Sequence, residues 1–306
     1  MNRYQAYGLI LESALPLPEL EVATGKADVF LEVSPIPRAH SEPGTPISLL
    51  DASETHVHLS WGGVGELIVE EPARIQLLCV ETAEDAALRL FVLGAGLGVL
   101  LDRLGYLVFH ASGVAVGNRA VGFLGGKGMG KSTLAAQFNL AGFPLITDEL
   151  FAITFGSDGQ PMVHTGPQQF RLWSDALECW GGNLKSAVRV RTGLDKFTVP
   201  GICKIDGAVP LAIAYVLSAG NSISIYPIDR SHSLLHLVPH LYVGRFGNAI
   251  FRASRHRTQR TFSQLEQLLT RIHVRRLCRE RDLRRLQDVT QCVEEDVTSE
   301  LAAFSQ

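Results

Sequence analysis

Cysteine is scarce in this chain, and its spacing argues against a metal or disulfide framework. The sequence has 306 residues with five cysteines, and no two of them form a CxxC pair. A structural zinc site or a set of disulfides would need closer and more regular pairs. We therefore expect reduced thiols and a cytoplasmic protein. The five are Cys79, Cys179, Cys203, Cys278 and Cys292.

Long hydrophobic runs are missing as well. The longest apolar stretch, Leu90–Leu101, is shorter than the roughly 20 residues that a membrane-spanning helix needs. The sequence begins Met-Asn-Arg-Tyr-Gln, without the apolar segment of a signal peptide. We expect neither a membrane span nor export.

An excess of positive charge is also absent. The net charge is −3, so the chain as a whole has no attraction to nucleic acid. Eleven arginines do lie between Arg252 and Arg285. The hydrophobic pattern there predicts a helix, a strand and a helix over 262–270, 272–277 and 282–293, so these arginines point in several directions. We expect a solvated or salt-bridged surface rather than a nucleic-acid groove.

What the chain does contain is a globular composition, with 46% hydrophobic and 19% charged residues. Its length suggests two domains, or one domain with a substantial extension. Residues 1–82 predict a small β-rich domain, with strands over 7–11, 27–33, 56–61 and 65–69. Residues 83–105 predict a buried connecting helix that ends at Gly105.

Residues 106–306 alternate between strands and helices, which predicts an α/β domain with a sheet that carries βαβ units. We expect strands over 106–110, 113–116, 120–124, 143–146, 150–155, 212–217 and 223–227. A helix is expected from Lys131 to Ala141, with Gly142 as its left-handed cap. The segment 166–201 has no clear pattern, and we expect a mobile loop around 186–196.

A glycine-rich segment between the strand over 120–124 and the helix after it matches GxxxxGK[ST] at every required position. In this context the pattern predicts a phosphate-binding loop. Backbone N–H groups of such a loop surround phosphate oxygens, and the helix N-terminus adds partial positive charge. Lys131 would reach the β- and γ-phosphates of ATP, and Ser132 would bind Mg²⁺. The expected nucleotide-binding residues are Gly125, Gly126, Lys127, Gly128, Met129, Gly130, Lys131, Ser132 and Thr133.

Two acids follow the next strand, at Asp148 and Glu149. The end of that strand is expected at the same edge of the sheet as the phosphate loop. One carboxylate could accept a proton from an attacking hydroxyl while the other helps to hold Mg²⁺. Asp148 is the leading catalytic candidate. The alternative is a pair of acids in a surface turn, and it is stronger for Glu149.

These elements together resemble HPr serine kinase/phosphorylase. The resemblance is carried by His110-Ala-Ser-Gly-Val114, by 125–133 and by Leu145-Ile-Thr-Asp-Glu149. Four further segments also look like the HPr-kinase-like proteins of lasso-peptide biosynthesis. They are Tyr4-Gln-Ala-Tyr-Gly8-Leu, 15–20, 27–29 and Phe170-Arg-Leu-Trp173. The fold that this implies is a P-loop HPr-kinase-like core with a small N-terminal β-rich domain.

The resemblance implies a kinase that uses ATP and Mg²⁺ to phosphorylate a serine of a protein or precursor peptide. It makes Asp148 the general base and His110 a neighbour that orients the site, although a structural role for His110 is equally open. Arg171 could clamp phosphate or a substrate carboxylate, or form a structural ion pair. Lys196 and Arg245 are weaker candidates, for which a solvated role is at least as good.

The chain departs from the bifunctional enzymes of that family. Thr133 replaces a glutamate after the loop serine, Glu149 replaces a second aspartate, and Gln169 stands where another acid is expected. We therefore expect kinase activity without phosphorylase activity. A small-molecule kinase and a nucleotide-binding regulatory ATPase stay as alternatives, and a homo-oligomer is left open.

Overall fold

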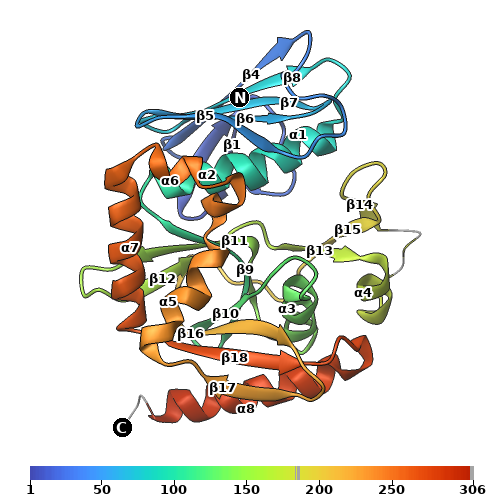
Figure 1. Cartoon of the computed structure of the whole chain (residues 1–306). Coiled ribbons are helices and arrows are strands. Elements are labelled where there is room, and N and C mark those ends of the chain that lie inside the picture. The colour runs from blue at the N-terminus through green and yellow to red at the C-terminus, as the bar shows by residue number, and fades with distance from the viewer. Residues whose placement is uncertain (183, 185–186, 304–306) are drawn as a thin grey trace. The chain divides into compact units, whose positions relative to one another are not determined.

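The computed structural model describes residues 1–182, 184 and 187–303. It is a mixed α/β structure with several sheets (Figure 1). By their internal contacts the residues form two units. One comprises 1–108, 190–192 and 241–264, and the other comprises 109–189, 193–240 and 265–306. The expected domains, 1–82, 83–105 and 106–306, remain a prediction.

The first unit contains an eight-stranded sheet in the order β3-β1-β2-β4-β8-β7-β6-β5. The helical segment expected over 83–105 is confirmed. It runs from Asp85 to Arg103 as α1 (Asp85–Phe91), a π-helical stretch (Val92–Gly96) and α2 (Leu97–Arg103). Gly96 lies so close to the sheet that an added Cβ would be 3.0 Å from the Leu67 side chain. The strands are β1 (Asn2–Ala6), β2 (Leu9–Ser13), β3 (Glu21–Val22), β4 (Val29–Ile36), β5 (Ser48–Ala52), β6 (His56–Trp61), β7 (Gly65–Glu70) and β8 (Arg74–Val80).

The second unit contains a seven-stranded sheet in the order β10-β9-β11-β12-β16-β18-β17, with β10 also paired to β16. The strands β10, β16 and β18 run parallel to one another, so their carboxyl ends meet at one edge. The strands are β9 (Leu107–Val116), β10 (Arg119–Leu124), β11 (Leu145–Phe155), β12 (Pro161–His164), β16 (Ala208–Ala219), β17 (Ser224–Pro227) and β18 (His273–Arg279).

Helix α3 (Lys131–Leu140) begins at the expected residue and ends one residue before the expected Ala141, which caps it. Gly142 has a φ of 99°, and its N–H donates to the Asn139 carbonyl at 3.1 Å. The N–H of Phe143 donates to the Phe138 carbonyl at 3.0 Å, which completes a Schellman cap. The apolar side of α3 packs with α8 (Leu286–Ala303) in the core of this unit.

Several expected elements are wrong in extent. One continuous strand, β9, replaces the two expected over 106–110 and 113–116. The C-terminal helices are α7 (Arg255–Leu269) and α8, which are longer than the expected 262–270 and 282–293. Not predicted were α5 (Arg230–Leu237), the short α6 (Ala249–Arg252) and the 3-10 turns Val238–His240, Tyr242–Phe246 and Leu283–Arg285.

The segment without a clear pattern contains a three-stranded sheet of β13 (Gln169–Trp173), β15 (Lys196–Pro200) and β14 (Val188–Arg189). Helix α4 (Ser174–Cys179) follows β13. Part of the loop expected around 186–196 falls on Ser186, which lies outside the described residues. No helix in the described part of the chain is both long and apolar enough to span a membrane, and all five cysteines are free thiols.

Candidate functional site

The glycine-rich segment Gly125–Thr133, here called the glycine loop, connects the end of β10 to the start of α3. Gly128 and Gly130 have φ values of 79° and 80°, a conformation that favours glycine. At Gly130 an added Cβ would also be 2.2 Å from Nη2 of Arg279. The backbone angle favours glycine there, and the loop curves tightly into the first turn of the helix.

Lys131 folds back over the glycine loop and is only 7% exposed. Its Nζ donates to the carbonyl oxygens of Gly125, at 2.8 Å, and Gly126, at 3.4 Å. The ammonium group is therefore held inside the curve of the loop. In the rest of the loop Lys127 and Gly128 are exposed, whereas Met129, Ser132 and Thr133 are half-buried. This arrangement of a cation, glycine backbone and a helix N-terminus suits a phosphate group.

Asp148 lies beside the strand that pairs with β10. Oδ1 of Asp148 accepts a hydrogen bond of 2.6 Å from the Ser112 hydroxyl on β9. In the β9–β10 register Ser112 is opposite Phe123, and Ala111 is opposite Leu124, the last residue of β10. Opposite residues of such strands lie about 5 Å apart. The carboxylate of Asp148 is thus close to the point where β10 enters the glycine loop.

The acids do not end a strand, which corrects the expected strand over 143–146. β11 runs without interruption from Leu145 to Phe155 and carries both acids in its interior. The backbone is distorted there, because Glu149 has a φ of 93°. Such a conformation costs a non-glycine residue about 1–3 kcal/mol. The buried Thr147 hydroxyl bridges the distortion by donating to the Leu150 carbonyl at 2.9 Å.

Arg171 on β13 contacts both acids. Its backbone N–H donates to Oδ2 of Asp148 at 3.2 Å, and its guanidinium forms a salt bridge with Glu149. Side chains of adjacent strand residues normally point to opposite faces. The distorted backbone at Glu149 lets two consecutive acids reach one arginine. Arg171 thus forms an ion pair, which was one of the roles expected for it from the sequence.

The remaining candidates lie in different places. His110 is on β9, two residues before Ser112, and therefore on the same face of the strand as Ser112. Lys196 begins β15 and pairs with Trp173 in the small sheet. Arg245 belongs to the first unit, where its guanidinium lies 4.9 Å from the ring centroid of Tyr242.

Two residues near the glycine loop were not predicted. Arg279 ends β18, and its Nη2 donates to the Met129 carbonyl at 2.9 Å. His240 is close enough to Lys131 to respond to its charge: burial first, then Lys131 and His236, lower the pKa of His240 to about 4. The parallel order of β10, β16 and β18 could have suggested Arg279. No sequence pattern pointed to His240.

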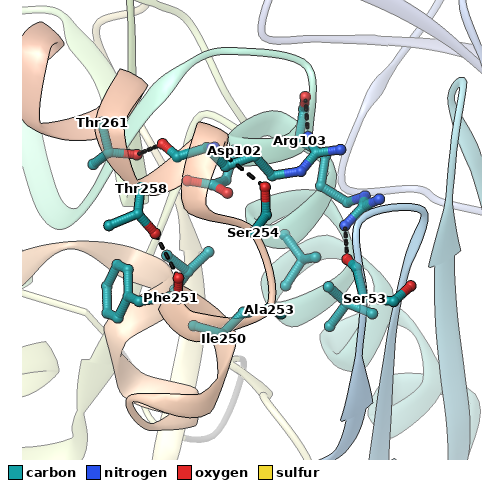
Figure 2. A pocket seen from close by; sticks show the side chains of 13 residues that line it. Ser53, Asp102, Arg103, Ile250, Phe251, Ala253, Ser254, Thr258 and Thr261 are labelled. Atoms are coloured by element: carbon teal, nitrogen blue, oxygen red, sulfur yellow. Dashed lines mark hydrogen bonds between the residues drawn. The ribbon is translucent and has the colours of Figure 1, made fainter.

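A different cavity, of about 20 Å³, lies within the first unit (Figure 2). It has room for about one water molecule and not for a nucleotide. Among its lining residues is Asp102. Burial raises the pKa of the Asp102 carboxyl to about 6 although Arg260, Arg257 and Arg103 act in the opposite direction. This cavity is therefore not a candidate for the phosphate site.

Oxygen donors for a metal ion are present near the glycine loop, although the described residues contain no cluster of three or more His, Cys, Asp or Glu side chains that could hold one. The donors are the half-buried Ser132 hydroxyl and the carboxylate of Asp148. Mg²⁺ usually takes few protein ligands together with substrate phosphates, so a small donor set fits this ion. Glu149 is also an oxygen donor, but its carboxylate contacts Arg171.

Comparisons with known proteins give a distant structural similarity. No family model matches the chain, and no curated protein matches it by sequence. Among solved structures it is similar to the HPr(Ser) kinase/phosphatase from Coxiella burnetii, with a TM-score of 0.33 and 12% identity. The match covers 65% of this chain and 99% of that chain. We therefore derive the function from the residues of the site.

Proposed function

We propose that this protein is an ATP- and Mg²⁺-dependent kinase that phosphorylates a serine hydroxyl of a protein or peptide. The observation that carries the proposal is the position of Asp148. Ser112 and the backbone of Arg171 hold its carboxylate beside the strand pair that leads into the glycine loop. A phosphate-binding loop and an oriented carboxylate are the two parts that phosphoryl transfer to a hydroxyl requires.

In the proposed reaction, loop N–H groups and Lys131 bind the phosphates of ATP. Asp148 accepts the proton of the serine hydroxyl as its oxygen forms a bond to the γ-phosphorus. The bond between that phosphorus and the bridging oxygen breaks, and ADP leaves. Magnesium, which Ser132 and Asp148 would hold, neutralises phosphate charge when bound. Positioning and charge neutralisation supply most of the catalysis in this chemistry.

Arg171 acts in this proposal as a positioning residue. Its backbone N–H fixes one oxygen of Asp148, while Ser112 fixes the other. Its guanidinium forms an ion pair with Glu149, the residue after Asp148, so Arg171 contacts both acids of β11.

The acceptor and the compartment are part of the same proposal. The resemblance to HPr-kinase-like proteins of lasso-peptide biosynthesis makes a precursor peptide the first acceptor to test. The five free thiols are compatible with the reducing cytoplasm.

The test is to incubate the protein with ATP labelled at the γ-phosphate, Mg²⁺ and candidate serine peptides. We expect the wild-type protein to transfer label to a serine of the peptide, and we expect no labelled peptide with the Lys131→Ala variant. Label on a small molecule would favour a metabolite kinase, and release of free phosphate alone would favour a regulatory ATPase. Either result would contradict a peptide kinase.

A further inference from the structure

Arg279 is a buried cation beside the glycine loop. The residue is 6% exposed and ends β18, at the sheet edge where the parallel strands β10, β16 and β18 finish. Its Nη2 donates to the Met129 carbonyl at 2.9 Å and its Nη1 to the Glu280 carbonyl at 3.3 Å. Its Nε is buried without a hydrogen-bond partner.

No carboxylate in residues 1–182, 184 and 187–303 pairs with this guanidinium. Burial first, and then the charge of Arg281, lower the pKa of Arg279, but an arginine stays protonated in proteins. A buried charge without a counter-ion is costly. Two carbonyl oxygens only partly satisfy the five N–H donors of a guanidinium.

The guanidinium of Arg279 lies beside one residue of the glycine loop, Gly130. Nη2 of Arg279 would be 2.2 Å from a Cβ at Gly130, the residue directly before Lys131. The guanidinium therefore faces the last glycine of the loop and the start of α3. Two buried cations, Arg279 and Lys131, thus flank one residue of the glycine loop. An anion bound there would neutralise both.

We propose that Arg279 binds the polyphosphate chain of the nucleotide and is the second cation of the site. This inference rests on the proposed function and adds a residue from outside the sequence motif. Arginine suits the role because its planar fork can contact two phosphate oxygens at once. In this structure one nitrogen of that fork donates to the Met129 carbonyl of the glycine loop.

The experiment compares Arg279→Met, Arg279→Lys and a matched control, Arg281→Met. Arg281 also contacts Met129, through Sδ at 3.3 Å, but it is exposed. Two quantities are measured for each variant: the dissociation constant for fluorescently labelled ADP with Mg²⁺, and the change in unfolding temperature caused by inorganic pyrophosphate. Pyrophosphate isolates the phosphate contacts from those of the base.

We expect Arg279→Met to weaken ADP binding roughly 10- to 100-fold and to remove the stabilisation by pyrophosphate. Arg279→Lys should be intermediate, and Arg281→Met should change binding by less than about 3-fold. Without ligand, Arg279→Met should unfold at the same or a higher temperature, because the variant buries no unpaired charge.

Three results would overturn the inference. If Arg279→Met binds ADP as tightly as the wild type while Lys131→Met does not bind it, then Arg279 does not contact the phosphates. That result leaves the proposed function intact. A ligand-free unfolding temperature that falls in Arg279→Met shows a structural role instead. No binding of ADP or pyrophosphate by the wild-type protein rejects the proposed function and this inference together.

Discussion

Asp148 is the residue on which the proposed chemistry depends, and its environment is unusual for a strand residue. Ser112 donates to one oxygen and the Arg171 backbone donates to the other. Both contacts fix the carboxylate without neutralising it. They come from β9 and β13, so the orientation of this side chain depends on three strands.

Replacing Asp148 by Asn should separate binding from chemistry. The amide has nearly the same shape but cannot accept the proton, so we expect phosphoryl transfer to fall about 10²- to 10⁴-fold. ATP binding should stay within a few-fold of wild type, whereas Lys131→Ala should lose it. The measurements are single-turnover transfer and a binding titration. Near-normal transfer by the asparagine variant would remove Asp148 from the mechanism.

His240 predicts a pH dependence of stability. Its pKa is about 4 in the folded protein and near 6.5 in an unfolded chain. The unfolded state therefore takes up the proton first, so stability that is complete above pH 6.5 is lost as the pH falls toward 4. Because His240 is only half-buried, we expect its share to be about 1–2 kcal/mol.

The check is urea unfolding at pH 7 and pH 4.5 for the wild type and His240→Gln. The difference between the two free energies of unfolding should shrink by that amount in the variant. An unchanged difference would show that the imidazole titrates normally in the folded state.

At the scale of elements, the sequence predicted α3 well because its signals are local. A glycine opens the helix, another closes it, and apolar residues cover one side. It predicted β11 poorly. The acids Asp148 and Glu149 resemble a turn, yet β11 continues through them to Phe155. Two of their partners, Ser112 and Arg171, lie 22 to 36 residues away in the sequence.

A glycine pair on β9 and β10 shows how tightly this sheet is packed. Gly113 and Gly122 are opposite each other in the register, and the Phe151 ring of β11 covers both. A Cβ added to Gly113 would be 2.4 Å from that ring. We expect Gly113→Ala to destabilise the protein by about 1–3 kcal/mol, measured by denaturant unfolding.

A second substitution tests the cause of that loss. Phe151→Leu in the Gly113→Ala background should recover part of the stability, because the smaller side chain makes room for the methyl group. If the two substitutions are simply additive, the ring is not what excludes the alanine.

At the scale of the whole molecule, part of the arginine-rich region is paired with acids of the same chain. Arg275 forms salt bridges with Asp296 and Glu300 of α8, and Arg285 with Asp288 at 3.0 Å. The acidic C-terminal helix thus pairs with the basic strand and turn that precede it. In the other unit Arg257 pairs with Glu71.

We therefore expect no specific binding of nucleic acid. The net charge is −3, and several of these arginines form salt bridges. Labelled DNA or RNA oligonucleotides should therefore show no saturable binding at about 0.15 M salt, where exposed charges are screened beyond about 8 Å. Fluorescence anisotropy provides the measurement. Tight, strongly salt-dependent binding would mean that these arginines form a continuous surface.

By itself the sequence determined the glycine loop, the helix after it, and the presence of acids downstream, because each depends on contiguous residues with characteristic backbone needs. Tertiary structure alone decided that Ser112 and Arg171 hold Asp148, that Glu149 is paired, and that Arg279 faces Gly130. These contacts join residues that lie 22 to 150 positions apart in the sequence. Only the pairing order and register of the sheets could bring them together.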